Sequence, residues 1–173
     1  MILTGPKIKR ERSRGNLTIE PFDDKYINPN SYDFRLGDTL VVYQNRTLDA
    51  KTANKTKTIK IPEEGLVLQP DTLYLGHTIE TIGSDVYVPI LRGKSSTGRM
   101  GLFVHITADL VDIGFEGQLT LMMHAVQPLR VYPGMRIGQI TFWQTMGDID
   151  LYDGKYQGSK LPMASQVYKD FDK

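Results

Sequence analysis

Short runs of alternating hydrophobic and polar residues recur along this chain of 173 residues. Four runs are rich in Val, Ile, Leu, Thr and aromatic residues and are bounded by Gly, Pro or Asp: 86–91, 102–106, 118–123 and 137–143. A repeat of two residues between turn-forming residues is typical of β-strands. Because Pro133-Gly134 is a turn dipeptide as well, the pattern predicts an all-β sandwich or barrel.

Three segments depart from this strand-like pattern. Residues 7–13 are expected to form a helix, and the hydroxyls of Ser95 and Ser96 are suited to capping a short helical turn. Residues 45–60 are polar and rich in Thr and Lys, which predicts a long loop or an exposed hairpin. The chain length itself fits a single domain.

Composition excludes several classes of site. The chain has no cysteine, which rules out disulfides, thiolate metal sites and thiol nucleophiles. No stretch approaches the ~20 apolar residues of a membrane span, and the opening residues are too short for the apolar core of a signal peptide. We therefore expect a cytoplasmic protein with no membrane partner.

A basic run near the start of the chain raises the question of nucleic-acid binding. The run also contains Glu11, and the net charge of the chain is only +1. A nucleic-acid surface usually shifts the charge of the whole domain, so we interpret the run as a solvated helix face and expect no nucleic-acid partner. Its members are Lys7, Lys9, Arg10, Arg12 and Arg14.

The segment from Gly93 to Arg99 is the first candidate for chemistry. It reads Gly-Lys-Ser-Ser-Thr-Gly-Arg, with hydroxyls between two cations. A glycine-flanked turn exposes backbone N–H groups, and the cations and hydroxyls add donors, so this loop suits a phosphate group. Basic loops rich in serine and glycine are also common without this role, so the loop alone is weak support.

Asp112 is the second candidate, because it follows an apolar run and precedes Gly114 and Phe115. A loop aspartate next to glycine is often a turn-former. It is equally suited to act as a general base or as a Mg²⁺ ligand.

The order and spacing of the motifs add weight to these candidates. The segment Asn-Pro-Asn-Ser-Tyr-Asp-Phe-Arg-Leu-Gly at 28–37 is followed by the 93–99 loop, by Asp-x-Gly-Phe-x-Gly at 112–117, and by the segments 133–139 and 154–158. Together they resemble the dCTP deaminase branch of the dCTP deaminase/dUTPase superfamily over nearly the whole chain. Members deaminate dCTP, hydrolyse dUTP to dUMP and diphosphate, or do both. Deamination in this family uses no zinc, in agreement with the missing zinc-deaminase signature.

The resemblance implies a distorted β-barrel or jelly roll of the dUTPase type, with a short N-terminal helix. It implies a homotrimer with active sites at the subunit interfaces. It also implies one dUTPase-like domain over residues 1–173, in which the C-terminal segment, about 150–173, closes over the active site.

The resemblance carries over a set of residues for the triphosphate of a deoxynucleotide. Lys94 stands where many members have Arg, and Asp112 matches an aspartate associated with the sugar and, in the diphosphatases, with activation of water. The positions expected to bind substrate are Lys94, Ser95, Ser96, Arg99, Gln139, Tyr152, Lys155 and Tyr156.

The part of the site expected to bind the base departs from the family pattern. Met122 replaces the family's glutamate, and a thioether neither gives nor takes a proton. Ala125 falls where an asparagine is usual, and Ser159 falls where a glutamine would contact the pyrimidine. A two-residue period places His124 on the same strand face as Met122, where it is either a proton carrier or a structural histidine.

These departures shape the expected activity. Deamination needs acid–base catalysis, worth about 10²–10⁴-fold, and Met122 does not supply it. The sequence therefore favours hydrolysis of a deoxynucleoside triphosphate, dUTP first, by Asp112 and by Mg²⁺ bound through the substrate phosphates rather than by protein ligands. Two alternatives stay open: a dCTP deaminase with a rearranged site using His124 or Glu116, and a catalytically inactive nucleotide-binding homologue that acts as a sensor or regulator.

Overall fold

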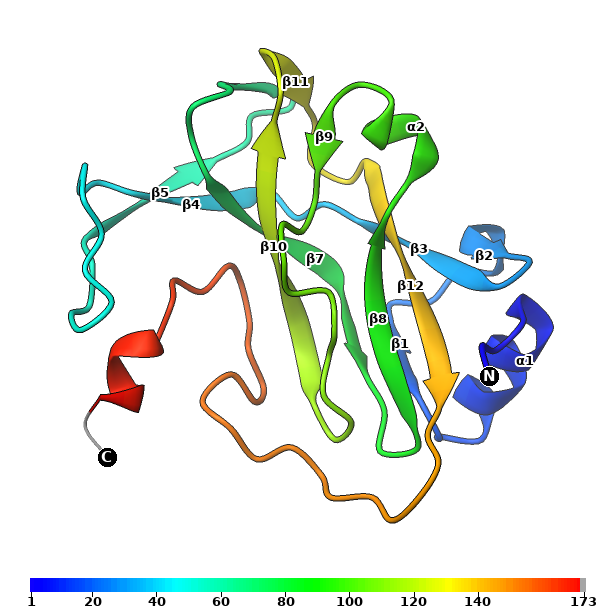
Figure 1. Cartoon of the computed structure of the whole chain (residues 1–173). Helices are drawn as coiled ribbons and strands as arrows, with labels where there is room; N and C mark the ends of the chain where they lie inside the picture. Colours follow the sequence, from blue (N-terminus) through cyan, green and yellow to red (C-terminus); the bar gives the residue numbers. More distant parts are fainter. Residues whose placement is uncertain (172–173) are drawn as a thin grey trace.

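A computed structural model describes residues 1–171, which form antiparallel β-sheets flanked by an N-terminal helix (Figure 1). The largest sheet has the strand order β5-β4-β7-β10-β9, with β1 also paired to β7. A second sheet has the order β2-β3-β12-β8, and β11 pairs with β6 in a third. The predicted all-β class with one short N-terminal helix is thereby confirmed.

The strands of the largest sheet are β1 (Thr18–Glu20), β4 (Thr39–Tyr43), β5 (Thr56–Lys60), β7 (Tyr74–Gly83), β9 (Leu102–Phe103) and β10 (Glu116–Ala125). Those of the second are β2 (Ile27–Asn28), β3 (Ser31–Arg35), β8 (Tyr87–Gly93) and β12 (Arg136–Gln144). The third consists of β6 (Leu66–Leu68) and β11 (Leu129–Val131).

Strand β10 shows why the alternating pattern produces this fold. Its residues are alternately buried and half-buried, and Leu121 and Met123 are fully enclosed in the core. Burial of each such side chain stabilises the fold by about 1.5–3 kcal/mol. Thr120, Met122 and His124 lie on the opposite face, as predicted, so one face of the strand builds the core and the other is available for a site.

Helix α1 (Gly5–Ser13) covers the predicted 7–13 segment and begins two residues earlier. Pro6 lies in its first turn, where the missing N–H costs nothing, and Ile8 is fully buried beneath the helix. The basic residues of α1 are largely paired with carboxylates of the same chain, which supports the interpretation of a solvated helix face. The pairs are Lys7 and Arg14 with Glu11, Lys9 with Asp24, and Arg12 with Glu20.

The predicted strand over 102–106 and the predicted capping role of Ser95 and Ser96 both need adjustment. The polar segment 45–60 is the exposed end of the β4–β5 hairpin, as expected, but β9 has only two residues where a strand over 102–106 was predicted. The short helix α2 (Ser95–Gly98) forms where a turn was expected, yet Lys94 is its N-cap and makes no side-chain capping bond. Ser95 and Ser96 lie inside the first turn rather than before it, so their hydroxyls are not in the capping position.

The chain after β12 runs below the lower ends of β8, β7 and β10 in Figure 1 and then turns up beside β10 towards the β4–β5 hairpin loop. It contains the 3₁₀ helix η2 (Val167–Asp170), and a second one, η1 (Asp24–Tyr26), precedes β2. Residues 172 and 173, the end of the predicted closing segment, lie outside the described residues. No helix among residues 1–171 has the length and apolar character needed to cross a membrane.

Candidate active site

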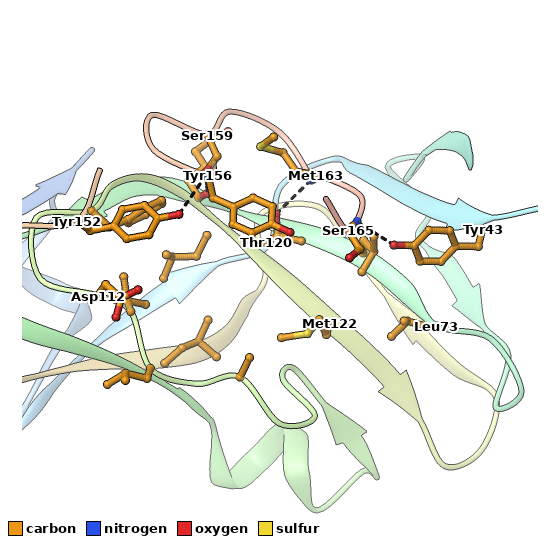
Figure 2. A pocket seen from close by; sticks show the side chains of 18 residues that line it. Tyr43, Leu73, Asp112, Thr120, Met122, Tyr152, Tyr156, Ser159, Met163 and Ser165 are labelled. Carbon is orange, nitrogen blue, oxygen red and sulfur yellow. Dashed lines mark hydrogen bonds between the residues drawn. The ribbon is translucent and has the colours of Figure 1, made fainter. Parts of the chain in front are cut away.

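A cavity of about 420 Å³ lies between β10, the loop before it and the C-terminal segment (Figure 2). Its size falls within the range of about 300–1,000 Å³ that is usual for small-molecule sites. Most lining side chains are apolar or aromatic, and Asp112 is the only carboxylate among the described residues that line it. Of the residues predicted for a site, Asp112, Met122, Tyr152, Tyr156 and Ser159 meet here.

Met122 is half-buried on the outer face of β10 and lies opposite Leu75 of β7. Leu73 and Met163 also line this end of the cavity. A charged residue here would have apolar neighbours on several sides, whereas a thioether fits them without desolvation cost. This end of the cavity is therefore suited to an apolar or aromatic group of a ligand.

Asp112 lies at the other end, on the loop that enters β10, and its side chain is exposed. The backbone of this loop is fixed, because Phe115 N donates to the Asp112 carbonyl oxygen at 3.1 Å. The Phe115 ring also packs against Tyr152, with 6.2 Å between ring centroids. The backbone of Asp112 is thus fixed at the rim of the cavity, and its exposed carboxylate is within reach of water and of a polar part of a ligand.

The two tyrosines of the site are themselves anchored. Tyr156 N donates to the Tyr152 hydroxyl at 3.2 Å, and Gln166 N donates to the Tyr156 hydroxyl at 2.9 Å. Lys155, between them in sequence, does not line the cavity; its ammonium donates to both carboxylate oxygens of Asp170, which raises the pKa of the lysine.

Residues 159–165, which we call the strap, form one wall of the cavity. No pattern in the sequence indicated how they are held. Backbone amides of the strap at every second residue donate to side-chain oxygens of the site (Figure 2 shows the second and third of these bonds). The three bonds are Leu161 N to Gln118 Oε1 at 2.7 Å, Met163 N to Thr120 Oγ1 at 3.1 Å, and Ser165 N to the Tyr43 hydroxyl at 2.9 Å.

Ser159 begins the strap and is buried. Its hydroxyl donates to the Gln118 carbonyl oxygen at 2.7 Å, and Gln118 N donates to the Ser159 carbonyl oxygen at 2.8 Å. Ala125, the other position predicted beside Met122 for the base, is not part of this cavity. It lies three positions after Met122 on β10, and an odd offset along a strand places a side chain on the opposite face. Ala125 is therefore fully buried in the core.

The phosphate-loop residues form a separate group at the end of β8. Ser95, Ser96 and Arg99 are exposed on α2 and after it, and none of the predicted phosphate-loop residues lines the cavity. Lys94 Nζ donates to Asp33 Oδ2 at 2.6 Å. Within residues 1–171 of a single chain, the phosphate loop and Asp112 therefore do not line the same cavity.

Gln139 belongs to this second group, and its carboxamide is engaged at both ends. Its Oε1 accepts from the Ser31 hydroxyl at 2.7 Å, and its Nε2 donates to the Gly93 carbonyl oxygen at 3.2 Å. The sequence predicted that Gln139 binds substrate; in the structure its side chain joins β3 to the start of the phosphate loop.

His124 lies beside Phe103 of β9, with 6.5 Å between ring centroids, and is not among the residues that line the cavity. Within residues 1–171 there is no group of three or more His, Asp or Glu side chains arranged to hold a metal ion. Binding of Mg²⁺ through the phosphates of a substrate therefore stays a prediction; Mg²⁺ commonly keeps several waters and uses substrate oxygens as ligands.

Comparison with known proteins places this geometry in context. Residues 2–145 match the family model described as dCTP deaminase-like. A protein of Clostridium beijerinckii named "dCTP deaminase, dUMP-forming" is 53% identical over 174 residues, covering 100% of both chains. Proteins with the same name from Leptospira biflexa and Cytophaga hutchinsonii are each 49% identical, with 100% of this chain and at least 99% of theirs covered.

A solved structure gives the same fold at lower identity. The 2'-deoxycytidine 5'-triphosphate deaminase of Agrobacterium tumefaciens superposes with a TM-score of 0.65 and 23% identity. The match covers 82% of this chain and 47% of that one. It supports the dUTPase-type fold and carries no argument about the reaction.

The names of the full-length relatives correct one expectation. We expected hydrolysis of dUTP as the favoured activity and considered dCTP deamination doubtful, because Met122 occupies the glutamate position. That order is wrong: relatives with about half of their residues identical are named dCTP deaminases, which supports the alternative of a dCTP deaminase with a rearranged site. The chain belongs to the dCTP deaminase-like family.

Proposed function

We propose that the protein converts dCTP into dUMP, releasing ammonia and diphosphate. The observation that carries this proposal is the full-length similarity to dUMP-forming dCTP deaminases, supported by a cavity with a carboxylate at its rim. The conversion consumes two waters. One water supplies the oxygen that replaces the 4-amino group of cytosine, and the other cleaves the bond between the α- and β-phosphates.

Asp112 is the group that we propose for proton transfer in the deamination. The attacking water must lose a proton and the leaving ammonia must gain one. Met122 can do neither, and Asp112 is the only carboxylate among the described lining residues. Asp112→Asn keeps the shape of the side chain and should lower ammonia release by about 10²–10⁴-fold, with dCTP affinity changed much less.

His124→Gln is the matched control, because His124 was the alternative proton carrier and lies outside the cavity. We expect this variant to retain ammonia release. Retained activity in Asp112→Asn together with lost activity in His124→Gln would reverse the assignment.

The triphosphate is proposed to bind the loop of Lys94, Ser95, Ser96 and Arg99. These residues combine two cations with hydroxyl donors, which is the chemistry that phosphate groups require. Mg²⁺ bound to the phosphates would neutralise part of their charge. Removal of Mg²⁺ by EDTA should therefore reduce diphosphate release, and added Mg²⁺ should restore it.

A homotrimer is proposed because one chain leaves the two halves of the site apart. A second copy would place its own phosphate loop against the cavity, as the resemblance to the family implies. Exposed apolar side chains near β9 and α2 support burial of this region by another copy. These are Met100, Phe103, Ile106, Leu110 and Val126. Light scattering should give three times the chain mass, and a stable monomer at micromolar concentration would contradict the shared site.

The deciding experiment measures ammonia and diphosphate from the same dCTP reaction, with dUTP as a parallel substrate. Equal yields of ammonia and diphosphate from dCTP would support the proposal. Diphosphate without ammonia from dCTP would overturn the deaminase assignment.

A second function, binding of dCTP without turnover, is favoured by one specific observation. Met122 places an apolar group where the family resemblance calls for an acid–base group, and the neighbouring Leu73 and Leu75 are apolar too. In that case, calorimetry would detect dCTP binding while neither ammonia nor diphosphate is released.

A further inference from the structure

A buried carboxylate holds the first cation of the phosphate loop. Asp33 lies on β3 with a side chain that is 1% exposed, and its Oδ2 accepts from Lys94 Nζ at 2.6 Å. Asn28 Nδ2 donates to Oδ1 at 2.8 Å, and Arg136 approaches Oδ2 at 3.4 Å. Each carboxylate oxygen of Asp33 thus has a donor, and its orientation is fixed.

The backbone at the start of the loop is fixed at the same place. Gln139 lies opposite Asp33 in the β3–β12 register, and its amide donates to the Gly93 carbonyl oxygen. The residue after Gly93 is Lys94, the N-cap of α2. The adjacent strands β3, β12 and β8 therefore fix both the backbone entry of the loop and the side chain of its first cation.

The charges at this cluster leave a cationic excess. Lys94 and Arg136 face one carboxylate, and Lys94 is 24% exposed, so its ammonium reaches solvent while it is ion-paired. An ammonium has three donors, and one of them is directed to Asp33. The other two remain suited to an anionic ligand on the solvent side.

We propose that Asp33 is a positioning residue, which preorganises Lys94 to bind the triphosphate of the substrate. The inference rests on the proposed function, because that function supplies the triphosphate. A lysine has a flexible four-carbon stem. Holding its ammonium before binding lowers the ordering cost that binding would otherwise carry.

Loss of the Asp33 charge has two opposing effects on the binding of an anion. Asp33→Asn removes a negative charge near the loop, and by Coulomb's law alone this would strengthen the binding of an anion. It also places an amide N–H where a carboxylate oxygen had accepted from Lys94, or else takes the carboxamide oxygen away from Asn28. If positioning outweighs the change in charge, triphosphate binding weakens.

A double-mutant cycle tests this coupling. Binding of inorganic triphosphate and of dCTP is measured by calorimetry for wild type, Asp33→Asn, Lys94→Ala and the double variant. We expect Asp33→Asn to weaken binding of both ligands about five- to tenfold in the presence of Lys94, and less than twofold in the Lys94→Ala background. For dCTP turnover, KM should rise with kcat unchanged.

Asp38→Asn is the matched control, because it breaks an ion pair with Lys60 elsewhere on the surface and should leave affinity unchanged. Tighter triphosphate binding by Asp33→Asn, or an equal loss with and without Lys94, would overturn the positioning role. A merely structural role would lower thermal stability without depending on Lys94.

Two further results separate this inference from the proposed function. If triphosphate binds with the expected coupling between Asp33 and Lys94 but no ammonia is released, the deaminase proposal is contradicted and the positioning role stands. If Asp33→Asn fails to fold, ¹⁵N NMR of the lysine ammonium groups in wild type replaces it, with Lys94→Arg used for assignment. A slowly exchanging Lys94 signal that shifts on addition of triphosphate is expected, and a signal that does not shift would overturn the inference.

Discussion

Three of the hydrogen bonds that hold the strap, those donated by the amides of residues 161, 163 and 165, make its local stability measurable. In Thr120→Val, a methyl group replaces the hydroxyl that accepts from Met163 N at 3.1 Å. The side-chain shape is nearly unchanged, so the substitution removes one acceptor and little packing. We expect the strap to open more often while the rest of the fold keeps its stability.

The magnitude follows from the bonds and from local strain. One neutral hydrogen bond contributes about 0.5–1.5 kcal/mol net, so three contribute about 1.5–4.5 kcal/mol. Leu161 opposes them, because its φ of 61° lies in the left-handed region, which costs a residue other than glycine about 1–2 kcal/mol. The loss of one bond should raise the equilibrium constant for strap opening about two- to twelvefold, at 1.4 kcal/mol for each factor of ten.

Hydrogen exchange is the direct assay, since local opening controls exchange of protected amides. Exchange at Met163 and Ser165 should accelerate in Thr120→Val, and amides of β10 should be unaffected. Thr120→Ser keeps the oxygen and serves as the control. Adding Tyr43→Phe to Thr120→Val removes a second acceptor and should bring the acceleration to about 5- to 140-fold. Equal exchange rates in the Val and Ser variants would show that the bond from Met163 N to Thr120 Oγ1 does not stabilise the closed strap.

Three other expectations concern ligand binding, pH and the core. Arg99→Ala should weaken dCTP and dUTP binding alike, by about 1.5–3 kcal/mol in calorimetry, and a loss confined to one base would contradict its phosphate role. Hydrogen bonds to Glu11, led by that of Lys7, lower its pKa to about 2. Its stabilisation is therefore present above pH 4.5, its ordinary pKa, and is lost as the pH falls towards 2, so urea titrations of Glu11→Gln should show a flatter pH dependence over this range. Glu80 is fully buried and accepts from Arg35 N and Nε; because Arg35 is partly exposed, Glu80→Leu should lower the free energy of unfolding by about 2–4 kcal/mol in urea denaturation, and an unchanged midpoint would contradict the pair's importance.

Features set by local sequence were predictable. The alternation of β10 depends on the two-residue period of a strand, so the face that carries Thr120 and Met122 followed directly from the sequence. Helix α1 and the β4–β5 hairpin likewise depend on nearby residues. Convergence of Asp112, Met122 and Ser159 on one cavity was implied by the family resemblance rather than by any local pattern.

Features set by long-range contacts were not predictable. The shortness of β9 reflects the path of the chain after residue 103. The burial of Ala125, in contrast, follows from the local strand phase of β10, which matching to the family motif overlooked. The roles of Gln139 and Asp33 depend on three strands meeting at the phosphate loop. A carboxamide that binds a carbonyl of its own chain looks the same in sequence as one that binds a ligand.

The cavity constrains how a deaminase can work in this chain. Gln118, Thr120 and Tyr43, which could otherwise recognise a polar base, each accept a hydrogen bond from the strap. Met122 adds an apolar surface beside them. In this closed arrangement the acceptor role of these oxygens is taken up by the strap, so we consider three sources of acceptors for the amino group of cytosine: Asp112, strap opening that frees these oxygens, and a second subunit. The strap variants distinguish these routes: if opening frees the recognition groups, Thr120→Val should change KM for dCTP by more than Thr120→Ser does, whereas recognition from Asp112 or a partner leaves the two variants alike.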